Sequence, residues 1–104
     1  MKSSVTGRHV DVTPTTRRII DQKLGKLERL LNDSAASVQV VLSQTAHRQC
    51  CAEIVLHVRG DHLLHGESEG DEWTHAIGAA VDKVNQQAQT LKGKWDGRHR
   101  HDVR

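Results

Sequence analysis

The most regular spacing of apolar residues in the chain lies between residues 71 and 95. Apolar side chains recur there every three or four positions, which at about 100° per residue places them on one face of an α-helix. This pattern predicts an amphipathic helix over Asp71–Trp95. Because the two tryptophans are the only aromatic residues of the protein and both lie on the stripe, we expect the core to be built against this helix. The stripe comprises Trp73, Ile77, Ala80, Val81, Val84, Ala88, Leu91 and Trp95.

A second helix is predicted to begin at Thr13-Pro14. Threonine is a favourable N-cap and proline is tolerated at the first helical position, where no backbone N–H is needed. The helix should run from Pro14 to about Asn32 and bury a stripe formed by Ile20, Leu24, Leu27 and Leu31.

Four segments have the spacing of β-strands. Cys50–Arg59 is the clearest, because apolar residues alternate with polar ones over its length. A turn at Gly60-Asp61 should connect it to the next strand. The other segments are Lys2–Arg8, Val38–Ser43 and His62–Glu69. The predicted order is β-α-β-β-β-α, an α+β fold in which a four-stranded sheet carries both helices on one face.

Length and composition limit the possible organisation of the protein. At 104 residues the chain forms one domain, which we place at residues 1–95, followed by a basic, disordered tail over residues 96–104. The sequence contains neither an apolar run long enough to cross a membrane nor a signal peptide, so we expect a cytoplasmic protein. Cys50 and Cys51 are adjacent and should point to opposite faces of a strand, which disfavours a disulfide.

Charge is distributed unevenly although the net charge is only +2. Residues 1–48 carry eight Lys/Arg and four Asp/Glu, net +4, and residues 83–104 carry six and two, again net +4. Residues 49–82 carry one Lys/Arg and seven Asp/Glu, net −6. If the two basic blocks meet in space, they form a surface suited to a polyanion, with the acidic block on another side.

The sequence gives little support for a metal site or for an enzyme active site. His62/His65 and His99/His101 are candidate metal pairs, but we favour structural or solvent-facing histidines because the cysteines lack the spacing of a zinc site. The acidic run Glu67, Glu69, Asp71, Glu72 could hold a hard cation, although a helix N-terminus in water explains it as well. No nucleophile elbow, Walker loop or His-Glu-x-x-His motif occurs, and we expect no enzyme and no cofactor.

Basic residues on the two predicted helices are the remaining signal. They lie beside or opposite the apolar stripes, so helices packed side by side would present one basic surface. A charged helix face is usually only solvated, but this arrangement also has the outline of a domain that binds double-stranded RNA. The candidate residues are Lys23, Lys26 and Arg29 on the first helix and Lys83, Lys92 and Lys94 on the second.

Several short segments together resemble the ribosome hibernation promoting factor family. These are Gly7, the Val10-x-Val12-Thr13 entry, Lys23-Leu24-x-Lys26-Leu27-Glu28, and, in the last helix, Ala76-Ile77, Asp82-Lys83, Gln87 and Lys92-x-Lys94. The family includes the ribosome-associated inhibitor protein Y and has also been called sigma-54 modulation protein. The resemblance covers about residues 2–95. Long members of the family add a C-terminal dimerisation domain, which we expect this protein to lack.

The resemblance implies a domain that occupies the mRNA and tRNA channel of the small ribosomal subunit and blocks translation during stress. It implies that rRNA is contacted by Lys23, Lys26, Lys83, Gln87, Lys92 and Lys94. The partner would be the small ribosomal subunit, with no membrane and no small-molecule substrate, and the protein should be a monomer off the ribosome.

The sequence departs from the family pattern in the last helix. It has Glu72, Thr74 and Gly78 where members usually have Asp, Tyr and Asp, and uncharged Gln86, Gln89 and Thr90 where members often have basic residues. A general RNA-binding or stress-response module without tight ribosome affinity is therefore the alternative function.

Overall fold

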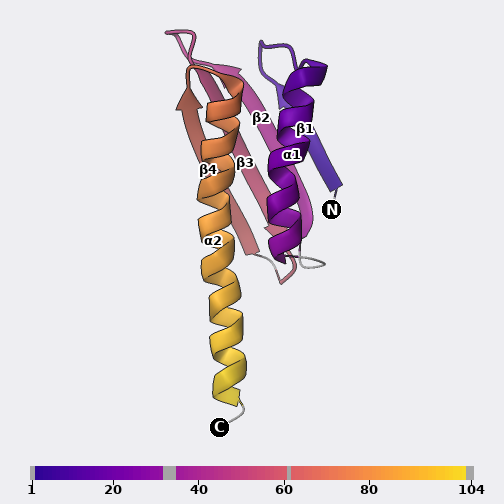
Figure 1. Cartoon of the computed structure of the whole chain (residues 1–104), viewed down its shortest axis with the longest axis vertical. Helices are drawn as coiled ribbons and strands as arrows, with labels where there is room; N and C mark the ends of the chain where they lie inside the picture. The colour runs from indigo at the N-terminus through magenta and orange to yellow at the C-terminus, as the bar shows by residue number, and fades with distance from the viewer. Residues whose placement is uncertain (1, 32–34, 61, 103–104) are drawn as a thin grey trace.

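The computed structural model describes residues 2–31, 35–60 and 62–102. It contains four strands and two helices in the order β-α-β-β-β-α, as the hydrophobic pattern predicts (Figure 1). The elements are β1 (Lys2–Gly7), α1 (Pro14–Leu31), β2 (Ala35–Gln44), β3 (Cys50–Val58), β4 (His62–Gly70) and α2 (Trp73–Asp102).

The strands form a single sheet in the order β1-β2-β3-β4. β1 pairs in parallel with β2, because α1 carries the chain back across the sheet between them, whereas β2, β3 and β4 are joined by short turns and pair antiparallel. Both helices lie side by side on one face of the sheet, and the other face is left open (Figure 1). The predicted α+β fold is confirmed.

The core lies between the sheet and the two helices. Strand β3 shows this most directly, because Ala52, Ile54 and Leu56 are 0% exposed while the residues between them are only half-buried. The predicted apolar stripe of α1 is buried in full, and that of α2 is buried from Ile77 to Ala88. At the ends of the α2 stripe, Trp73 and Leu91 are half-buried and pack against the core, and the side chain of Trp95 lies outside the described residues.

The N-terminus of α1 is capped as the sequence predicts. The Thr13 hydroxyl accepts a hydrogen bond from the backbone N–H of Thr16 at 3.1 Å, and the Thr13 carbonyl accepts one from the N–H of Arg17 at 2.9 Å. These two bonds satisfy backbone donors that would otherwise lack a partner in the first turn. The helix ends at Leu31, and the predicted last residue, Asn32, lies outside the described residues.

Helix α2 differs from the prediction at both ends. It begins at Trp73 rather than Asp71, because the pairing of β4 with β3 continues to Gly70 opposite Cys50. It continues past the predicted end at Trp95 to Asp102. No proline follows Trp95, and glycine weakens a helix by only about 1 kcal/mol, so nothing in the sequence forces the helix to stop there. A boundary between a domain and a tail at Trp95 stays a prediction.

The remaining strand boundaries differ from the prediction by one to three residues. β1 ends at Gly7 and β3 at Val58, each one residue earlier than predicted. β2 is longer, because Gln44 pairs with Cys50 at one end and Ala35 with Val58 at the other. Gly60 has a φ of 91°, as a tight turn requires, while its predicted turn partner Asp61 lies outside the described residues.

Helix α2 approaches β4 closely at one glycine. A Cβ atom on Gly66 would lie 2.5 Å from the carbonyl oxygen of Ala80 and 2.9 Å from a methyl of Val84. The missing side chain therefore lets the helix backbone come against the outermost strand. Along the described chain, no helix is both long and apolar enough to cross a membrane.

Candidate nucleic-acid interface

The helix layer holds the predicted basic residues, and α1 presents them most openly. Lys26 is exposed to solvent, and Arg29 is exposed with its Nε donating a bond of 3.3 Å to the carbonyl of Gly25 one turn earlier. Since both residues lie off the buried stripe of α1, their charged groups face outward from the domain. Arg18 is also exposed on this helix, so α1 carries a run of accessible cations.

Two further lysines lie along the seam between α1 and α2. Lys23 is half-buried, and a Cβ on Gly78 of α2 would lie 3.8 Å from its Nζ, which places the ammonium against the second helix. Lys92 of α2 reaches the other way, with its Nζ 3.4 Å from the carbonyl oxygen of Leu30 near the end of α1. The seam thus holds one cation from each helix, Lys23 against Gly78 of α2 and Lys92 against the end of α1.

Lys83 and Gln87 lie on the opposite flank of α2, beside the edge strand β4. The Lys83 ammonium donates a bond of 2.6 Å to the carbonyl of Glu67. The Gln87 side-chain amide bonds to both backbone groups of His65: its Oε1 accepts from the N–H at 3.0 Å, and its Nε2 donates to the carbonyl at 2.5 Å. These side chains occupy backbone groups of β4 that no neighbouring strand pairs.

The predicted site residues therefore fall into three groups. Lys26 and Arg29 face solvent on α1, Lys23 and Lys92 lie at the seam, and Lys83 and Gln87 cap the edge of β4. The side chain of Lys94 lies outside the described residues. The capping role of Gln87 was not visible in the sequence, because it depends on which side of α2 faces β4.

Between Trp73 and Gly93, the part of α2 whose side chains are described, the outward side is mostly uncharged or acidic. Its exposed residues there include Asp82, Gln86, Gln89 and Thr90. The departures from the family pattern in this helix thus remain on the surface, where they lower the density of positive charge. Among the residues with described side chains, the positive surface of the helix layer consequently belongs mainly to α1 and to the seam.

Acidic residues gather on the open face of the sheet, away from the helices. Glu53 on β3 pairs with Glu67 on β4, and Cys51 pairs with Glu69 in the next row. Burial raises the pKa of the Cys51 thiol, and the neighbouring glutamates raise it further, against a lowering hydrogen bond with Ser43. Burial and Asp71 likewise raise the pKa of Cys50, so both thiols, which are free, stay protonated at neutral pH.

The structure groups histidine and acids differently from the sequence-based candidates. Among the described residues, the only group of His, Cys, Asp and Glu side chains close enough to share a metal ion is Glu53, His65 and Glu67. The acidic run before α2 does not converge, because Glu67 and Glu69 belong to β4 while Asp71 and Glu72 follow it. The group was missed because Glu53 is brought to His65 only by the register of β3 and β4.

Comparison with known proteins identifies the family. Residues 3–96 match the model of the family described as Sigma 54 modulation protein / S30EA ribosomal protein, which is nearly the whole folded part of the chain. The chain therefore belongs to this family, and the resemblance carried by its short motifs is confirmed.

Individual relatives and solved structures agree with this assignment. The chain is 33% identical to the ribosome hibernation promoting factor of Klebsiella oxytoca over 94 residues, covering 90% of this chain and 96% of the relative. It is 28% identical to the ribosome hibernation promotion factor of Bacillus subtilis, but spans only 53% of that protein. The N-terminal domain of Thermus thermophilus Protein Y superposes with a TM-score of 0.76 at 29% identity, covering 88% of this chain and 99% of that domain.

Proposed function

We propose that this protein is a ribosome hibernation factor that binds the small ribosomal subunit in the cytoplasm and blocks its mRNA and tRNA channel. The observation that carries the proposal is the family match over residues 3–96, together with a relative named ribosome hibernation promoting factor that this chain covers over 96% of its length. The proposed activity is binding alone, by a monomer, without a cofactor or a catalytic step.

The charge distribution on the helix layer supports rRNA as the ligand. Lys26 and Arg29 are exposed on α1, and Lys23 and Lys92 extend the positive surface across the seam to α2. Phosphate groups of RNA bind such cations and release counterions, whereas the acidic open face of the sheet would repel the same backbone. The protein would therefore approach the ribosome with its helices first.

The residues bonded to β4 have a different part in this proposal. Lys83 is exposed and holds a single carbonyl, a bond whose net worth in water is about 0.5–1.5 kcal/mol. Its ammonium can exchange that carbonyl for a phosphate at low cost. Gln87 holds two backbone groups of His65, so it contributes to rRNA binding only by giving up its cap on β4.

Co-sedimentation with small ribosomal subunits over a series of potassium concentrations tests the proposal. We expect binding that weakens steeply with salt, because each phosphate neutralised contributes about 0.7–0.9 to the negative slope of log affinity against log salt. Affinity that does not change with salt would contradict the electrostatic account, and absence of binding at low salt would contradict ribosome association itself.

Charge reversal tests which surface binds. Lys26→Glu combined with Lys83→Glu should abolish co-sedimentation while leaving the fold intact, since both residues are exposed. The free energy of unfolding should change by no more than about 0.5 kcal/mol at Lys26 and by up to about 1.5 kcal/mol at Lys83, which loses its bond to the Glu67 carbonyl. The matched control is Lys2→Glu combined with Arg59→Glu, which makes the same change in net charge at exposed positions outside the helices. Equal loss in both variants would show that net charge alone governs binding.

Binding of the unmutated protein to an RNA duplex and to the small subunit separates general RNA binding from ribosome binding. A parent protein that binds an RNA duplex but not the small subunit would favour the alternative of an RNA-binding or stress-response module. The uncharged outward residues of α2, Gln86, Gln89 and Thr90, are the feature that would account for such a weakened ribosome affinity.

A further inference from the structure

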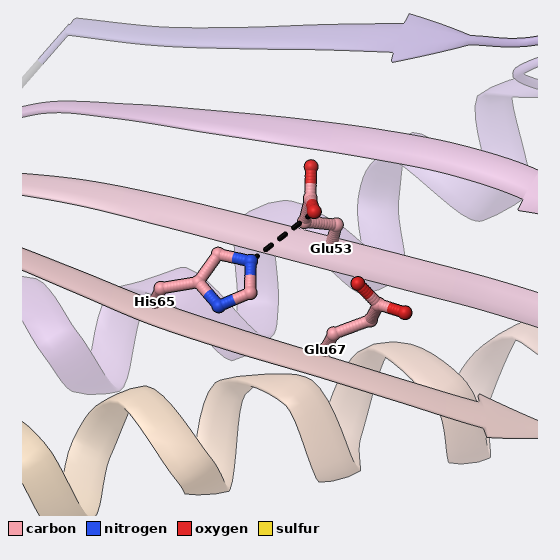
Figure 2. Close-up of side chains that lie close together, drawn as sticks. All are labelled: Glu53, His65 and Glu67. Carbon is pink, nitrogen blue, oxygen red and sulfur yellow. Dashed lines mark hydrogen bonds and ion pairs between the residues drawn. The ribbon is translucent and has the colours of Figure 1, made fainter.

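Three side chains converge on the open face of the sheet, on the side opposite the helices. Glu53 comes from β3, and His65 and Glu67 come from neighbouring same-face positions of β4, where the strand pairing places Glu67 directly opposite Glu53. Figure 2 shows the imidazole and the two carboxylates turned toward one another. The His65 Nε2 lies 3.1 Å from the Glu53 Oε2, and one ligand atom of each residue falls within 4.8 Å of the others.

We propose that Glu53, His65 and Glu67 form a binding site for a divalent transition metal ion of the zinc class. One imidazole nitrogen and two carboxylate oxygens are ligands that such an ion accepts, at metal–ligand distances of about 2.0–2.2 Å. Ligand atoms already within 4.8 Å of one another can reach those distances by small side-chain rotations. Three protein ligands leave a fourth position for water, because the site opens to solvent.

The strand pairing favours a cation at this group, because it places two carboxylates opposite one another. Two carboxylates directly opposite one another on adjacent strands repel and weaken the pairing. Lys83 bonds to the backbone carbonyl of Glu67 from the helix side, so that bond does not involve either carboxylate. Glu69 lies next along β4 and adds a further negative charge. A divalent ion between Glu53 and Glu67 would neutralise both.

Histidine determines which class of ion the site selects. Mg²⁺ and Ca²⁺ prefer oxygen ligands, whereas imidazole suits zinc and its neighbours in the first transition row. His65 is about half exposed, with 52% of its side chain accessible, so an ion can enter from solvent without any backbone movement. The three side chains lie on the sheet face opposite the exposed cations of α1, and titration of the free protein measures metal occupancy without ribosomes.

Isothermal titration of the metal-free protein with ZnCl₂ tests the proposal. All titrations use a His99→Gln/His101→Gln background, which removes the tail histidines as competing ligands. We expect one Zn²⁺ per chain, and His65→Gln should lower the affinity by at least about tenfold, the lower limit for losing even an indirect partner of a metal ligand. Glu53→Gln should lower it as well. The control His47→Gln makes the same substitution at an exposed turn residue outside the group and should leave the affinity unchanged.

Two results would overturn the proposal. The first is a Zn²⁺ affinity in His65→Gln equal to that of the background protein. The second is MgCl₂ binding that matches ZnCl₂ and is insensitive to His65→Gln, which would reduce the group to an exposed acidic patch. NMR gives a second readout, because the ring protons of His65 should shift at one equivalent of Zn²⁺ while those of His47 do not.

Discussion

The two faces of the sheet show how one alternating pattern serves two different needs. On β3, Ala52, Ile54 and Leu56 face the helices and are 0% exposed, while Glu53 and Val55 between them are half-buried on the open face. A shift of one residue in register would exchange the two sets. The comparison teaches that the hydrophobic half of the pattern determines where the helices pack, and the other half is left free to carry charge.

The same division separates the charges of the protein. Cations lie on the helix layer and at its seam, whereas Glu53, Glu67 and Glu69 lie on the open face of the sheet. The fold thus brings these three glutamates together on one side of the domain and the cations of α1 on the other, although Asp82 of the acidic block lies on α2. The following predictions test how sharply the two sides differ.

The largest difference between the two faces is expected in the stability lost when adjacent residues of β3 are truncated to alanine. Ile54→Ala should lower the free energy of unfolding by about 2–5 kcal/mol, because the removed atoms leave a cavity under both helices. Val55→Ala should cost clearly less, because Val55 is only half-buried on the open face. Urea unfolding measures both, and similar losses would mean that the open face is covered in solution.

Glycine substitutions should separate a packed position from an open one. Gly66→Ala should destabilise the protein by about 1–3 kcal/mol, because the new methyl would collide with the carbonyl of Ala80 unless α2 moves away from β4. Gly25→Ala, in the interior of α1 with no atom within 4 Å of the new Cβ, should stabilise it by about 0.5–1 kcal/mol. Thermal melts measure both changes, with a lower melting temperature expected for Gly66→Ala and a higher one for Gly25→Ala. A stabilised Gly66→Ala would contradict the close approach of α2.

Removing one charge from the open face should give a small gain in stability. Glu67→Gln should raise the free energy of unfolding of the metal-free protein by about 0.2–1 kcal/mol, because it ends the repulsion from Glu53 across the strands. The gain should shrink as salt screens the charges. A loss of stability at low salt would show that Glu67 is held by a favourable interaction that outweighs the repulsion.

The adjacent cysteines offer the same comparison through the reactivity of their thiols. Cys50 is 7% exposed on the helix side, and its neighbour Cys51 is half-buried on the open face. Burial raises the pKa of both thiols, so both should react slowly with a thiol reagent near pH 8, with Cys51 modified first. Because the pKa of each thiol is higher in the folded state, the contribution of the two thiols to stability should be fully present below the unfolded value near 9 and should be lost as the pH rises through the folded values. Mass spectrometry of quenched samples identifies the order of modification.

Much of the fold could be predicted because its signals are local. The stripe of Ile20, Leu24, Leu27 and Leu31 and the Thr13 cap each depend on residues within a few turns of one another. The group of Glu53, His65 and Glu67 could not be found in the same way, because Glu53 lies in another strand. The spacing of His65 and Glu67 does place them on one face of a strand, and a prediction of register would have completed the group.

The sequence could predict which residues of the candidate interface lie off the buried helix stripes, but not which neighbouring element each of them contacts. Sequence periodicity puts Lys83 and Gln87 off the buried stripe of α2, yet it cannot say that this flank lies against β4 while Lys92 lies against α1. That difference depends on how the two helices are placed across the sheet. Whether these residues contact rRNA stays a prediction, to be decided by the charge-reversal variants.

The Gln87 amide has a consequence for how copies of this chain can meet. By holding both the N–H and the carbonyl of His65, it closes the β4 edge of the sheet to an incoming strand at that position. Lys83 covers one further group of this edge, the carbonyl of Glu67. The opposite margin is β1, a strand of six residues. Two chains that joined through β1 would have only their closed β4 margins outward, so such an assembly would end at two copies and could not lengthen into a filament.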